Sequence, residues 1–378
     1  MRIGIEAQRL FRKKKHGMEV VALEVIRHLQ EIDHENEYFV FVKDDEDSDC
    51  LNKTANFEIV TLPAASYPVW EQVHLPKAAK KYNLDVLHCT CNTAPLLTSI
   101  PMVLTLHDII YLESVSFKGT AYQNFGNLYR RYLVPKIVGK CEKVLTVSHF
   151  EKEKIVDRLG LNPNKVQVVY NAINRNFRKV EDEAALIRIR EEYALPTDFI
   201  LLFGNTAPKK NTIGALKAYV SYCEAVSDPL PMVITDIDPQ FIEKLLQELK
   251  ATHLRKNLHL KDYIAFDQLP IVYSMASFFL YPSLRESFGM PILEAMACGT
   301  PVITSDTSSM PEVSGGAALL SDPFEPASIT EQMVKLHDDE KLRSDLRSKG
   351  LARASEFNWS NTAAEVLSVF KALHKIPA

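Results

Sequence analysis

Long apolar runs are missing from this sequence. Nowhere among its 378 residues do about 18 apolar side chains follow one another, which is the length that a membrane-spanning helix needs. The N-terminal Met-Arg-Ile-Gly-Ile-Glu is typical of a short buried strand, because no apolar stretch of the length found in signal peptides follows its basic start. We therefore expect a cytoplasmic protein, either soluble or peripherally bound at the inner face of the membrane.

An excess of positive charge is also absent. The chain has 44 Lys and Arg against 48 Asp and Glu, a formal net charge of −4. Phosphate backbones select a basic surface, so we expect no nucleic acid as a main partner. The length favours two domains, at roughly 100–200 residues per domain.

Paired cysteines and two common nucleotide motifs are lacking too. No Cys-x-x-Cys occurs, so we expect buried, reduced thiols. Cys89 and Cys91 would share one face of a strand while His88 points away, which disfavours a metal site there. No Gly-x-Gly-x-x-Gly follows an early strand and no Gly-Lys-Ser/Thr occurs, which excludes a Rossmann dehydrogenase and a P-loop enzyme. The six cysteines are Cys50, Cys89, Cys91, Cys141, Cys223 and Cys298.

What the sequence does contain is an alternation of short apolar, β-branched runs with longer amphipathic stretches. Continuous apolar strands between helices predict an α/β protein with two doubly wound parallel sheets, each Rossmann-like. The charged stretch 174–196 lacks a strand pattern, so we expect domains at 1–175 and 176–355 and a final helix within 356–378. We predict strands at 2–6, 38–42, 58–62, 85–89, 102–106, 143–147, 166–169, 199–203, 232–235, 258–260, 278–281 and 302–304. We predict helices at 20–31, 71–81, 121–140, 150–159, 211–225, 239–249, 270–276, 291–298, 327–336 and 360–374.

The strongest chemical pattern follows the apolar run 278–281. Gly289 permits a tight turn, and Pro291 suits the first position of a helix. The free N–H groups at such a helix start, together with the helix dipole, favour phosphate. Glu286 and Glu294 bracket the turn as pure hydrogen-bond acceptors. Together these features suit a nucleoside diphosphate joined to a sugar, with hydroxyls at both ends.

The pair Glu286-x7-Glu294, followed by Ala-Met-Ala-Cys-Gly-Thr-Pro-Val, resembles glycosyltransferase family 4, whose members are retaining enzymes of the GT-B fold. The resemblance extends over nearly the whole chain. Trp70-Glu71-Gln72 and Asn92-Thr-Ala-Pro are most similar to the family's bacterial mannosyltransferase-like members. It implies an acceptor-binding first domain and a donor-binding second domain that face each other across a cleft, and a C-terminal helix that crosses back to the first.

The resemblance also implies roles on the donor side. It assigns Glu286 to hydroxyls of the donor sugar and Glu294 to the ribose. The backbone N–H groups of Phe288, Gly289 and Met290 would contact the donor as well.

A basic loop follows the predicted strand 199–203. Lys209 and Lys210 could neutralise a diphosphate without a metal ion, and an exposed basic turn is the alternative. The loop resembles the family's Gly-x-x-x-Pro-Arg-Lys-Asn loop, whose basic pair binds the donor phosphates. That likeness covers Gly204, Lys209 and Lys210, with Lys209 where arginine is usual.

Polar residues also follow strands in the first half. His107 could donate a hydrogen bond into the cleft, and a structural histidine is the alternative. The resemblance places His107 at the donor sugar near the reacting carbon, with Asp108 orienting the loop or the histidine. It puts Asn92 and Ser148 on the acceptor side.

Two further loops match the family more weakly. Gly17 lies where the family has a loop that closes over the donor phosphates, and a mobile basic loop is the alternative. Tyr263 and Ile264 lie where the family binds the base, which we expect to occur through their backbone.

The expected reaction moves a hexose, with mannose and GDP-mannose favoured, from a nucleoside diphosphate to a hydroxyl of a glycan or lipid-linked acceptor. Such transfer serves the synthesis of cell-surface polysaccharide or lipopolysaccharide. No Asp-x-Asp motif lies in the segments expected at the cleft, so we expect neither a metal nor a cofactor. The alternatives are a nucleotide-sugar epimerase, a phosphorylase, and a non-catalytic subunit that binds nucleotide sugars.

The predicted helix within 122–140 carries aromatic and basic side chains together. Such a helix can lie on an anionic bilayer, which would give the protein peripheral membrane contact. The alternative is a solvated helix packed on the sheet. The sequence gives no indication of an oligomeric state.

Overall fold

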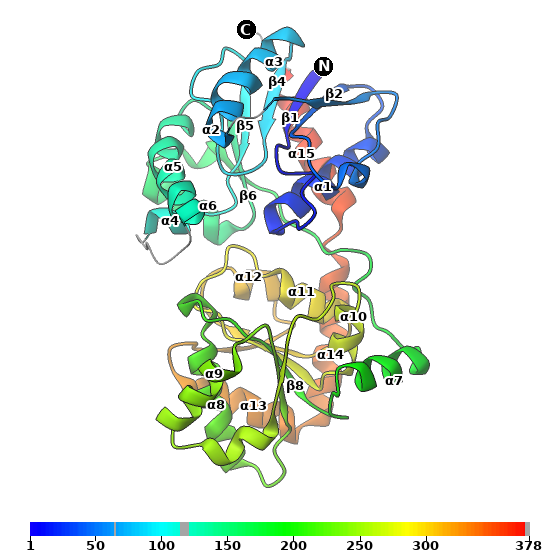
Figure 1. Ribbon diagram of the computed structural model, residues 1–378, viewed down its shortest axis with the longest axis vertical. Coiled ribbons are helices and arrows are strands. Elements are labelled where there is room, and N and C mark those ends of the chain that lie inside the picture. The colour runs from blue at the N-terminus through cyan, green and yellow to red at the C-terminus, as the bar shows by residue number, and fades with distance from the viewer. Residues whose placement is uncertain (64–65, 114–120, 375–378) are drawn as a thin grey trace. The chain divides into compact units, whose positions relative to one another are not determined.

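A computed structural model describes residues 1–63, 66–113 and 121–374, and the chain divides into two compact units (Figure 1). Unit 1 comprises Met1–Asn171 and the segment from Asn358 onward, and unit 2 comprises Ala172–Phe357. The limits that the sequence suggested, at 175 and 355, lie a few residues from these boundaries.

Unit 1 is built on a parallel sheet of seven strands in the order β3-β2-β1-β4-β5-β6-β7. These strands are almost continuously apolar, as expected of a sheet covered on both faces. Its strands are β1 (Arg2–Glu6), β2 (Glu37–Val42), β3 (Phe57–Thr61), β4 (Val86–Cys89), β5 (Met102–Thr105), β6 (Lys143–Thr146) and β7 (Val166–Val168). Its helices are α1 (Gly17–Ile32), α2 (Tyr67–Val69), α3 (Leu75–Lys81), α4 (Ile110–Glu113), α5 (Ala121–Ile137), α6 (His149–Leu159) and α15 (Trp359–His374), with a π-helical turn at Trp70–His74.

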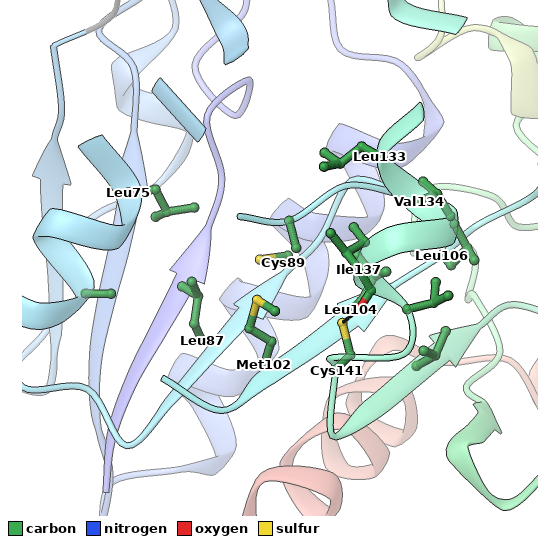
Figure 2. Packing of buried hydrophobic residues seen from close by; sticks show 14 of the residues in the cluster. Leu75, Leu87, Cys89, Met102, Leu104, Leu106, Leu133, Val134, Ile137 and Cys141 are labelled. Carbon is green, nitrogen blue, oxygen red and sulfur yellow. Dashed lines mark hydrogen bonds between the residues drawn. The ribbon is translucent and has the colours of Figure 1, made fainter. Parts of the chain in front are cut away.

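One face of this sheet is covered by α3 and α5. Figure 2 shows Leu104 of the sheet beside Ile137 from α5, and Leu87 of the sheet on the side of Leu75 from α3. All four side chains are at most 2% exposed, so this layer is a close-packed core. The period of two along each strand sends the alternate residues to the other face.

The other face of the sheet is covered by α1 and α15. Ile5 and His88 of the strands lie near Val25 of α1 and Val366 of α15. The final helix is therefore part of unit 1, although unit 2 separates it in sequence from the rest. The hydroxyl of Thr362 donates a hydrogen bond to a backbone carbonyl of the first segment at 2.9 Å, which ties the helix down.

Unit 2 repeats the plan with a parallel sheet of six strands in the order β10-β9-β8-β11-β12-β13. Its strands are β8 (Ile200–Phe203), β9 (Met232–Thr235), β10 (Leu258–Lys261), β11 (Phe278–Tyr281), β12 (Val302–Ser305) and β13 (Leu319–Ser321). Its helices are α7 (Glu183–Glu192), α8 (Thr212–Ala225), α9 (Pro239–Glu248), α10 (Leu269–Met275), α11 (Met290–Ala297), α12 (Met310–Ser314), α13 (Pro326–Asp338) and α14 (Glu340–Ser355).

Four of these elements were not expected from the sequence, and one of them is the five-residue helix α12. The edge strand β13 has only three residues, too few for a period to show. In α14 only Leu346, Gly350 and Ala354 are buried, so the helix reads as a charged stretch. In α7 only Ile189 is buried, so no apolar stripe marks the helix in the sequence. In each case tertiary packing stabilises an element that the periodicity of apolar residues does not predict.

The cysteines are all free thiols, but they are not all buried as expected. Cys89, Cys141 and Cys298 are buried, whereas the other three are partly exposed. The expectation was therefore wrong for Cys50, Cys91 and Cys223.

Gly204 lies where two backbone segments approach closely, directly after β8. A Cβ at this position would lie 2.5 Å from the carbonyl oxygen of Thr235 and 2.7 Å from the Cβ of Ile237. Gly204→Ala should therefore lower the free energy of unfolding of unit 2 by about 1–3 kcal/mol, the usual cost of overpacking. Chemical denaturation measures this, with Gly139→Ala as the control because a Cβ there would meet nothing within 4 Å. Equal stability of the two variants would contradict the prediction.

Candidate active site

The strand order reverses once in each sheet, and parallel α/β sheets open a crevice at the carboxyl ends of the strands at that point. In unit 2 the reversal lies between β8 and β11, which pair in parallel. The loop 204–211 follows β8, and the loop 282–289 follows β11. The basic pair and the first glutamate predicted from the sequence therefore meet at this reversal.

Lys210 and Glu286 form an ion pair there. The Nζ of Lys210 lies 2.6 Å from Oε1 of Glu286 and donates a hydrogen bond to the hydroxyl of Tyr281 at 3.0 Å. Burial alone would raise the pKa of Glu286, but the Lys210 ammonium outweighs it and holds the pKa below its ordinary value. Glu286 is therefore ionised at neutral pH.

Backbone contacts hold the two loops together. Lys209 and Lys210 end a short 3-10 helix, and the carbonyl of Lys209 accepts a hydrogen bond from the N–H of Leu284 at 2.7 Å. Asn211 takes a left-handed conformation, with φ 57°, and its Nδ2 donates to the carbonyl of Pro282 at 3.1 Å. The basic pair is thus fixed relative to Glu286 by the fold itself.

The helix α11 begins at this loop. Gly289 precedes it with φ 105°, a conformation that favours glycine, and the hydroxyl of Ser309 donates to the carbonyl of Phe288 at 2.8 Å. Because α11 begins at Met290, Pro291 occupies its second position and the prediction of the first position was wrong by one residue. The consequence is small, because N–H groups throughout the first turn lack intrahelical partners.

Glu294 lies one turn inside α11 and is partly buried. Its Oε2 accepts a hydrogen bond from the hydroxyl of Tyr273 at 3.3 Å. Burial raises the pKa of Glu294 to about 7, so its charge changes near neutral pH. The two glutamates therefore differ, because Glu286 has a cation beside it and Glu294 does not.

This difference predicts a pH effect on donor binding. If the carboxylate of Glu294 accepts ribose hydroxyls, affinity for an intact nucleotide sugar should fall about tenfold from pH 8 to pH 6, as the ionised fraction falls around a pKa near 7. Titration calorimetry without acceptor measures it. Glu294→Gln should bind more weakly, with no such pH dependence. A tenfold fall that persists in Glu294→Gln would contradict the role.

The same group also affects stability. A folded-state pKa near 7, above the ordinary 4.5, gives a stabilisation that is complete below pH 4.5 and is lost as the pH rises through 7. Glu294→Gln should flatten this part of the stability profile of unit 2.

The predicted base-binding loop follows β10. That strand is separated from β8 by β9, which puts it about 10 Å away at about 4.8 Å per strand. Tyr263 is 61% exposed and Ile264 is buried. The spacing agrees with a base at one end of a nucleotide whose phosphates lie at Lys210, and base binding itself stays a prediction.

An Asp-x-Asp pair does follow a strand, although none was expected in the segments at the site. Asp236 and Asp238 follow β9, and Oδ1 of Asp238 accepts the N–H of Gln240 at 2.9 Å to cap α9. Among residues 1–63, 66–113 and 121–374, no three His, Cys, Asp or Glu side chains are grouped to hold a metal ion. Independence from metals stays a prediction.

In unit 1 the structure brings Asn92 and His107 together. Oδ1 of Asn92 accepts the backbone N–H of His107 at 2.6 Å, and Nε2 of the His107 ring lies 3.0 Å from the carbonyl of Thr90. Asn92 has φ 68°, which a short polar side chain tolerates. Burial lowers the pKa of His107, so its imidazole is neutral at neutral pH.

The remaining residues predicted in unit 1 have structural tasks. Oδ1 of Asp108 accepts the N–H of Ile110 at 3.0 Å, so Asp108 shapes the loop as expected. Ser148 is fully buried, and its hydroxyl oxygen caps α6 by accepting the N–H of Glu151. Gly17 is exposed at the start of α1. Their contacts with a ligand stay predictions, and so do those of His107, which belongs to a different unit from the Lys210–Glu286 pair.

Sequence reasoning missed a buried carboxylate in unit 1. Glu71 is fully buried in the π-helical turn and accepts hydrogen bonds from the hydroxyls of Tyr67, Thr93 and Tyr129. The π-helical turn itself is a form found often at functional sites. The motif Trp70-Glu71-Gln72 was a visible signal, but the partners come from distant segments.

Two family models match the chain in succession. The model described as "Glycosyltransferase Family 4" matches residues 16–177, and the model described as "Glycosyl transferases group 1" matches residues 187–353. The two matches together leave little of the chain uncovered and identify it as a protein of the glycosyltransferase class. It combines a domain of glycosyltransferase family 4 with a domain of glycosyl transferases group 1.

Two curated relatives are 27% and 30% identical to the chain over the aligned residues. The chain is 27% identical over 275 residues to the serotype-specific mannosyltransferase WbdA of Escherichia coli, covering 72% of this chain and 33% of that protein. It is 30% identical over 254 residues to the O-antigen chain mannosyltransferase RfbU of Salmonella typhimurium, covering 66% and 64%. The chain therefore spans about a third of the first relative and less than two thirds of the second.

Solved structures share the fold of the whole chain at low identity. HepE of Anabaena, in complex with UDP and glucose, has a TM-score of 0.72 and 17% identity, covering 98% of this chain and all of that one. WaaG, a glycosyltransferase of lipopolysaccharide biosynthesis, has a TM-score of 0.69 and 14% identity, covering 97% and 99%. The fold is that of the GT-B glycosyltransferases.

Proposed function

We propose that the protein is a hexosyltransferase that moves mannose from a nucleoside diphosphate to a hydroxyl of a glycan or lipid-linked acceptor. The observation that carries the proposal is the Lys210–Glu286 ion pair beside the start of α11, at the strand reversal of unit 2. WbdA and RfbU are named as mannosyltransferases, and the latter as one of O-antigen chains, which supports mannose and a role in lipopolysaccharide synthesis.

The same geometry supports a role for each group in the donor site. Lys210, Lys209 and the start of α11 would stabilise the charge that gathers on the departing diphosphate. Glu286 would hold hydroxyls of the sugar, and the backbone N–H groups of Gly289 and Met290 would face the phosphates. HepE is described in complex with UDP and glucose, which supports a nucleotide-sugar donor but not a particular base.

We propose further that transfer retains the anomeric configuration and uses neither a metal nor a cofactor. The bond between the sugar carbon and the phosphate oxygen breaks, and the acceptor oxygen bonds to that carbon from the same face. The departing phosphate oxygen takes the proton of the acceptor hydroxyl, so no protein nucleophile is needed. Exclusion of water would protect the donor from hydrolysis.

The test is a thermal-shift screen with UDP, GDP, ADP and their sugars, followed by a transfer assay. We expect GDP and GDP-mannose to raise the melting temperature most, and product formation to need an acceptor but neither phosphate nor a divalent ion. No shift with any nucleotide would overturn the proposal. Turnover without an acceptor would indicate an epimerase, and turnover that depends on inorganic phosphate would indicate a phosphorylase.

Peripheral membrane contact is a second part of the proposal. On α5, Phe125, Leu128 and Tyr132 are 54%, 49% and 61% exposed, and their spacing places them on one face. Lys136 lies beside Tyr132 on the same helix. An exposed apolar face next to basic side chains suits an anionic bilayer surface. In the part of the chain that the structure describes, no helix is long and apolar enough to span a bilayer.

Flotation with anionic vesicles tests this contact. The protein should float with vesicles rich in anionic lipid, and Leu128→Ser with Tyr132→Ser should reduce the floating fraction severalfold. Leu97→Ser is the matched control, because Leu97 is 77% exposed in the same unit but lies outside α5. Flotation that is absent, or unchanged in the double variant, would refute it.

A further inference from the structure

Unit 1 has a pocket of about 460 Å³ at the strand reversal of its own sheet, which lies between β1 and β4. Arg9 and Arg12 follow β1, and Thr93 follows β4, so the pocket opens where a doubly wound sheet is expected to bind a ligand. Phe125 and Tyr129 of α5 close its side. All of its lining residues belong to unit 1, so it is distinct from the site at Lys210 and Glu286.

The lining of this pocket is strongly basic. Three guanidinium groups line it, those of Arg9, Arg12 and Arg130, against a single carboxylate, that of Glu19. Glu19 lies 3.8 Å from Arg9, so it neutralises part of the charge. The Nε–H of Arg130 is buried without a hydrogen-bond partner among the described residues. A planar guanidinium suits the oxygens of a phosphate, so this lining favours a phosphorylated ligand.

The same pocket presents hydroxyl oxygens next to these arginines, since the guanidinium of Arg9 lies 4.9 Å from the ring centroid of Tyr67. Tyr67, Thr93 and Tyr129 line the pocket, and each donates a hydrogen bond to the buried Glu71 behind them. The oxygens of Tyr67 and Tyr129 lie 2.8 and 2.5 Å from the carboxylate. Each hydroxyl has one proton, and with that proton directed at Glu71 the oxygen can only accept. Tyr129 already accepts from Nε2 of Gln72 at 2.9 Å, and the oxygens of Tyr67 and Thr93 lie 2.7 Å apart, so the remaining lone pairs are those available to a ligand. This wall therefore suits a ligand that donates from several hydroxyls, as a sugar does.

Aromatic rings complete the lining. Tyr67 and Tyr129 meet edge to face with ring centroids 6.0 Å apart, and Phe125 stacks on Tyr129 at 6.3 Å. An apolar wall with a few convergent polar groups is the usual make-up of a small-molecule site, and a volume of 460 Å³ lies within the usual range.

We propose that this pocket binds the acceptor as a phosphorylated sugar. The phosphate would lie on Arg9, Arg12 and Arg130, and the sugar hydroxyls would donate to the wall that Glu71 orients. Glu71 is thus a positioning residue, since it acts through Tyr67 and its neighbours. The inference rests on the proposed function, because it makes this pocket the acceptor half of the transfer.

Two kinds of molecule carry a phosphorylated sugar. One is a soluble sugar phosphate, and the other is a lipid carrier with a phosphate-linked sugar. Phe125 belongs both to the pocket and to the exposed apolar face of α5, which would bring a lipid-borne phosphate to the arginines. A water-soluble, short-chain prenyl diphosphate sugar represents the second source. Binding tighter than that of the sugar phosphate identifies the lipid carrier, and equal or weaker binding identifies the soluble ligand.

Titration calorimetry on the full chain tests the proposal, with a saturating nucleoside diphosphate to occupy the site in unit 2. Mannose 1-phosphate should bind at least tenfold tighter than methyl mannoside, which lacks the phosphate, and than inorganic phosphate, which lacks the sugar. Equal affinity for mannose 1-phosphate and methyl mannoside would overturn the basic half of the proposal. Equal affinity for mannose 1-phosphate and inorganic phosphate would overturn the hydroxyl half.

Variants locate the binding in this pocket. Arg130→Gln and Arg9→Gln should each weaken mannose 1-phosphate about tenfold and leave methyl mannoside unchanged. Glu71→Gln should weaken both ligands, because it releases the hydroxyl wall from its single orientation. Arg188→Gln is the matched control, an exposed arginine of α7 in unit 2. Unchanged binding of mannose 1-phosphate in both arginine variants would place the ligand elsewhere.

The outcome separates this inference from the proposed function. Stabilisation by nucleotide without binding of mannose 1-phosphate overturns only the inference. Failure of every nucleotide to stabilise the protein overturns the function. In that case the arginine variants still decide whether the pocket binds a phosphorylated sugar.

Discussion

Replacing Lys210 with alanine should lower kcat for sugar transfer by about two to three orders of magnitude, the usual effect of removing one group that stabilises developing charge. The ammonium lies beside Glu286 and Tyr281 at the strand reversal, where a leaving diphosphate would gather its charge. Its loss should also raise the pKa of Glu286, because burial then acts without a cation beside it. Steady-state kinetics and circular dichroism, run together, measure activity and fold.

Lys217→Ala is the control for this variant, since Lys217 is an exposed lysine on α8 in the same unit. It removes the same charge and should retain full activity. If Lys210→Ala is poorly folded, Lys210→Met keeps the aliphatic stem and answers the same question. Full activity in a folded Lys210 variant would refute the assignment.

Replacing Glu71 with alanine should lower the free energy of unfolding of unit 1 by about 3 kcal/mol, because each buried donor that loses its acceptor costs about 1–3 kcal/mol. Glu71 is fully buried, and its loss leaves the hydroxyls of Tyr67, Thr93 and Tyr129 without their acceptor. The hydroxyls of Tyr67 and Thr93 then keep only their contact with each other, and that of Tyr129 keeps only the hydrogen bond that it accepts from Gln72. Urea denaturation followed by a probe in unit 1 measures the loss.

Glu71→Gln should cost much less, because an amide oxygen still accepts part of the network. Glu153→Ala is the matched control, an exposed glutamate on α6 in the same unit. A Glu71→Ala variant as stable as the Glu153→Ala control would show that the network contributes nothing to stability.

The two units apply one topological rule to different chemistry. In unit 2 the loops at the strand reversal carry Lys210 and Glu286. In unit 1 the same position carries Arg9, Tyr67 and Thr93 around a pocket. The topology of a parallel sheet therefore determines the position of a ligand site, and the side chains of the loops determine its specificity.

Local pattern was enough for most strands and for the donor-side loops. The run 278–281 is apolar and short, and the loop after it combines Gly289 and Pro291. The sequence therefore predicted both the strand and the start of the helix. Lys210 and Glu286 were each expected just after a strand, where ligands bind, but their meeting depends on the pairing of β8 with β11.

What could not be predicted depends on tertiary packing. The network around Glu71 joins hydroxyls at 67, 93 and 129, and no periodicity links such distant positions. The raised pKa of Glu294 depends on burial, which a sequence motif does not report. The helix α14 packs through a stripe of three small or apolar residues, and the rest of its surface is largely charged. Its apolar periodicity is therefore too weak to predict a helix.

The final helix has a consequence for synthesis of the protein. Because α15 covers one face of the first sheet, the core of unit 1 cannot be completed until all of unit 2 has also been translated. On the nascent chain the apolar side of α1, including Val25 and Ile26, therefore stays uncovered while the second unit is made. Unit 2 is a single uninterrupted segment and can close first. The core of the first unit is thus completed only after the whole of the second unit has been translated.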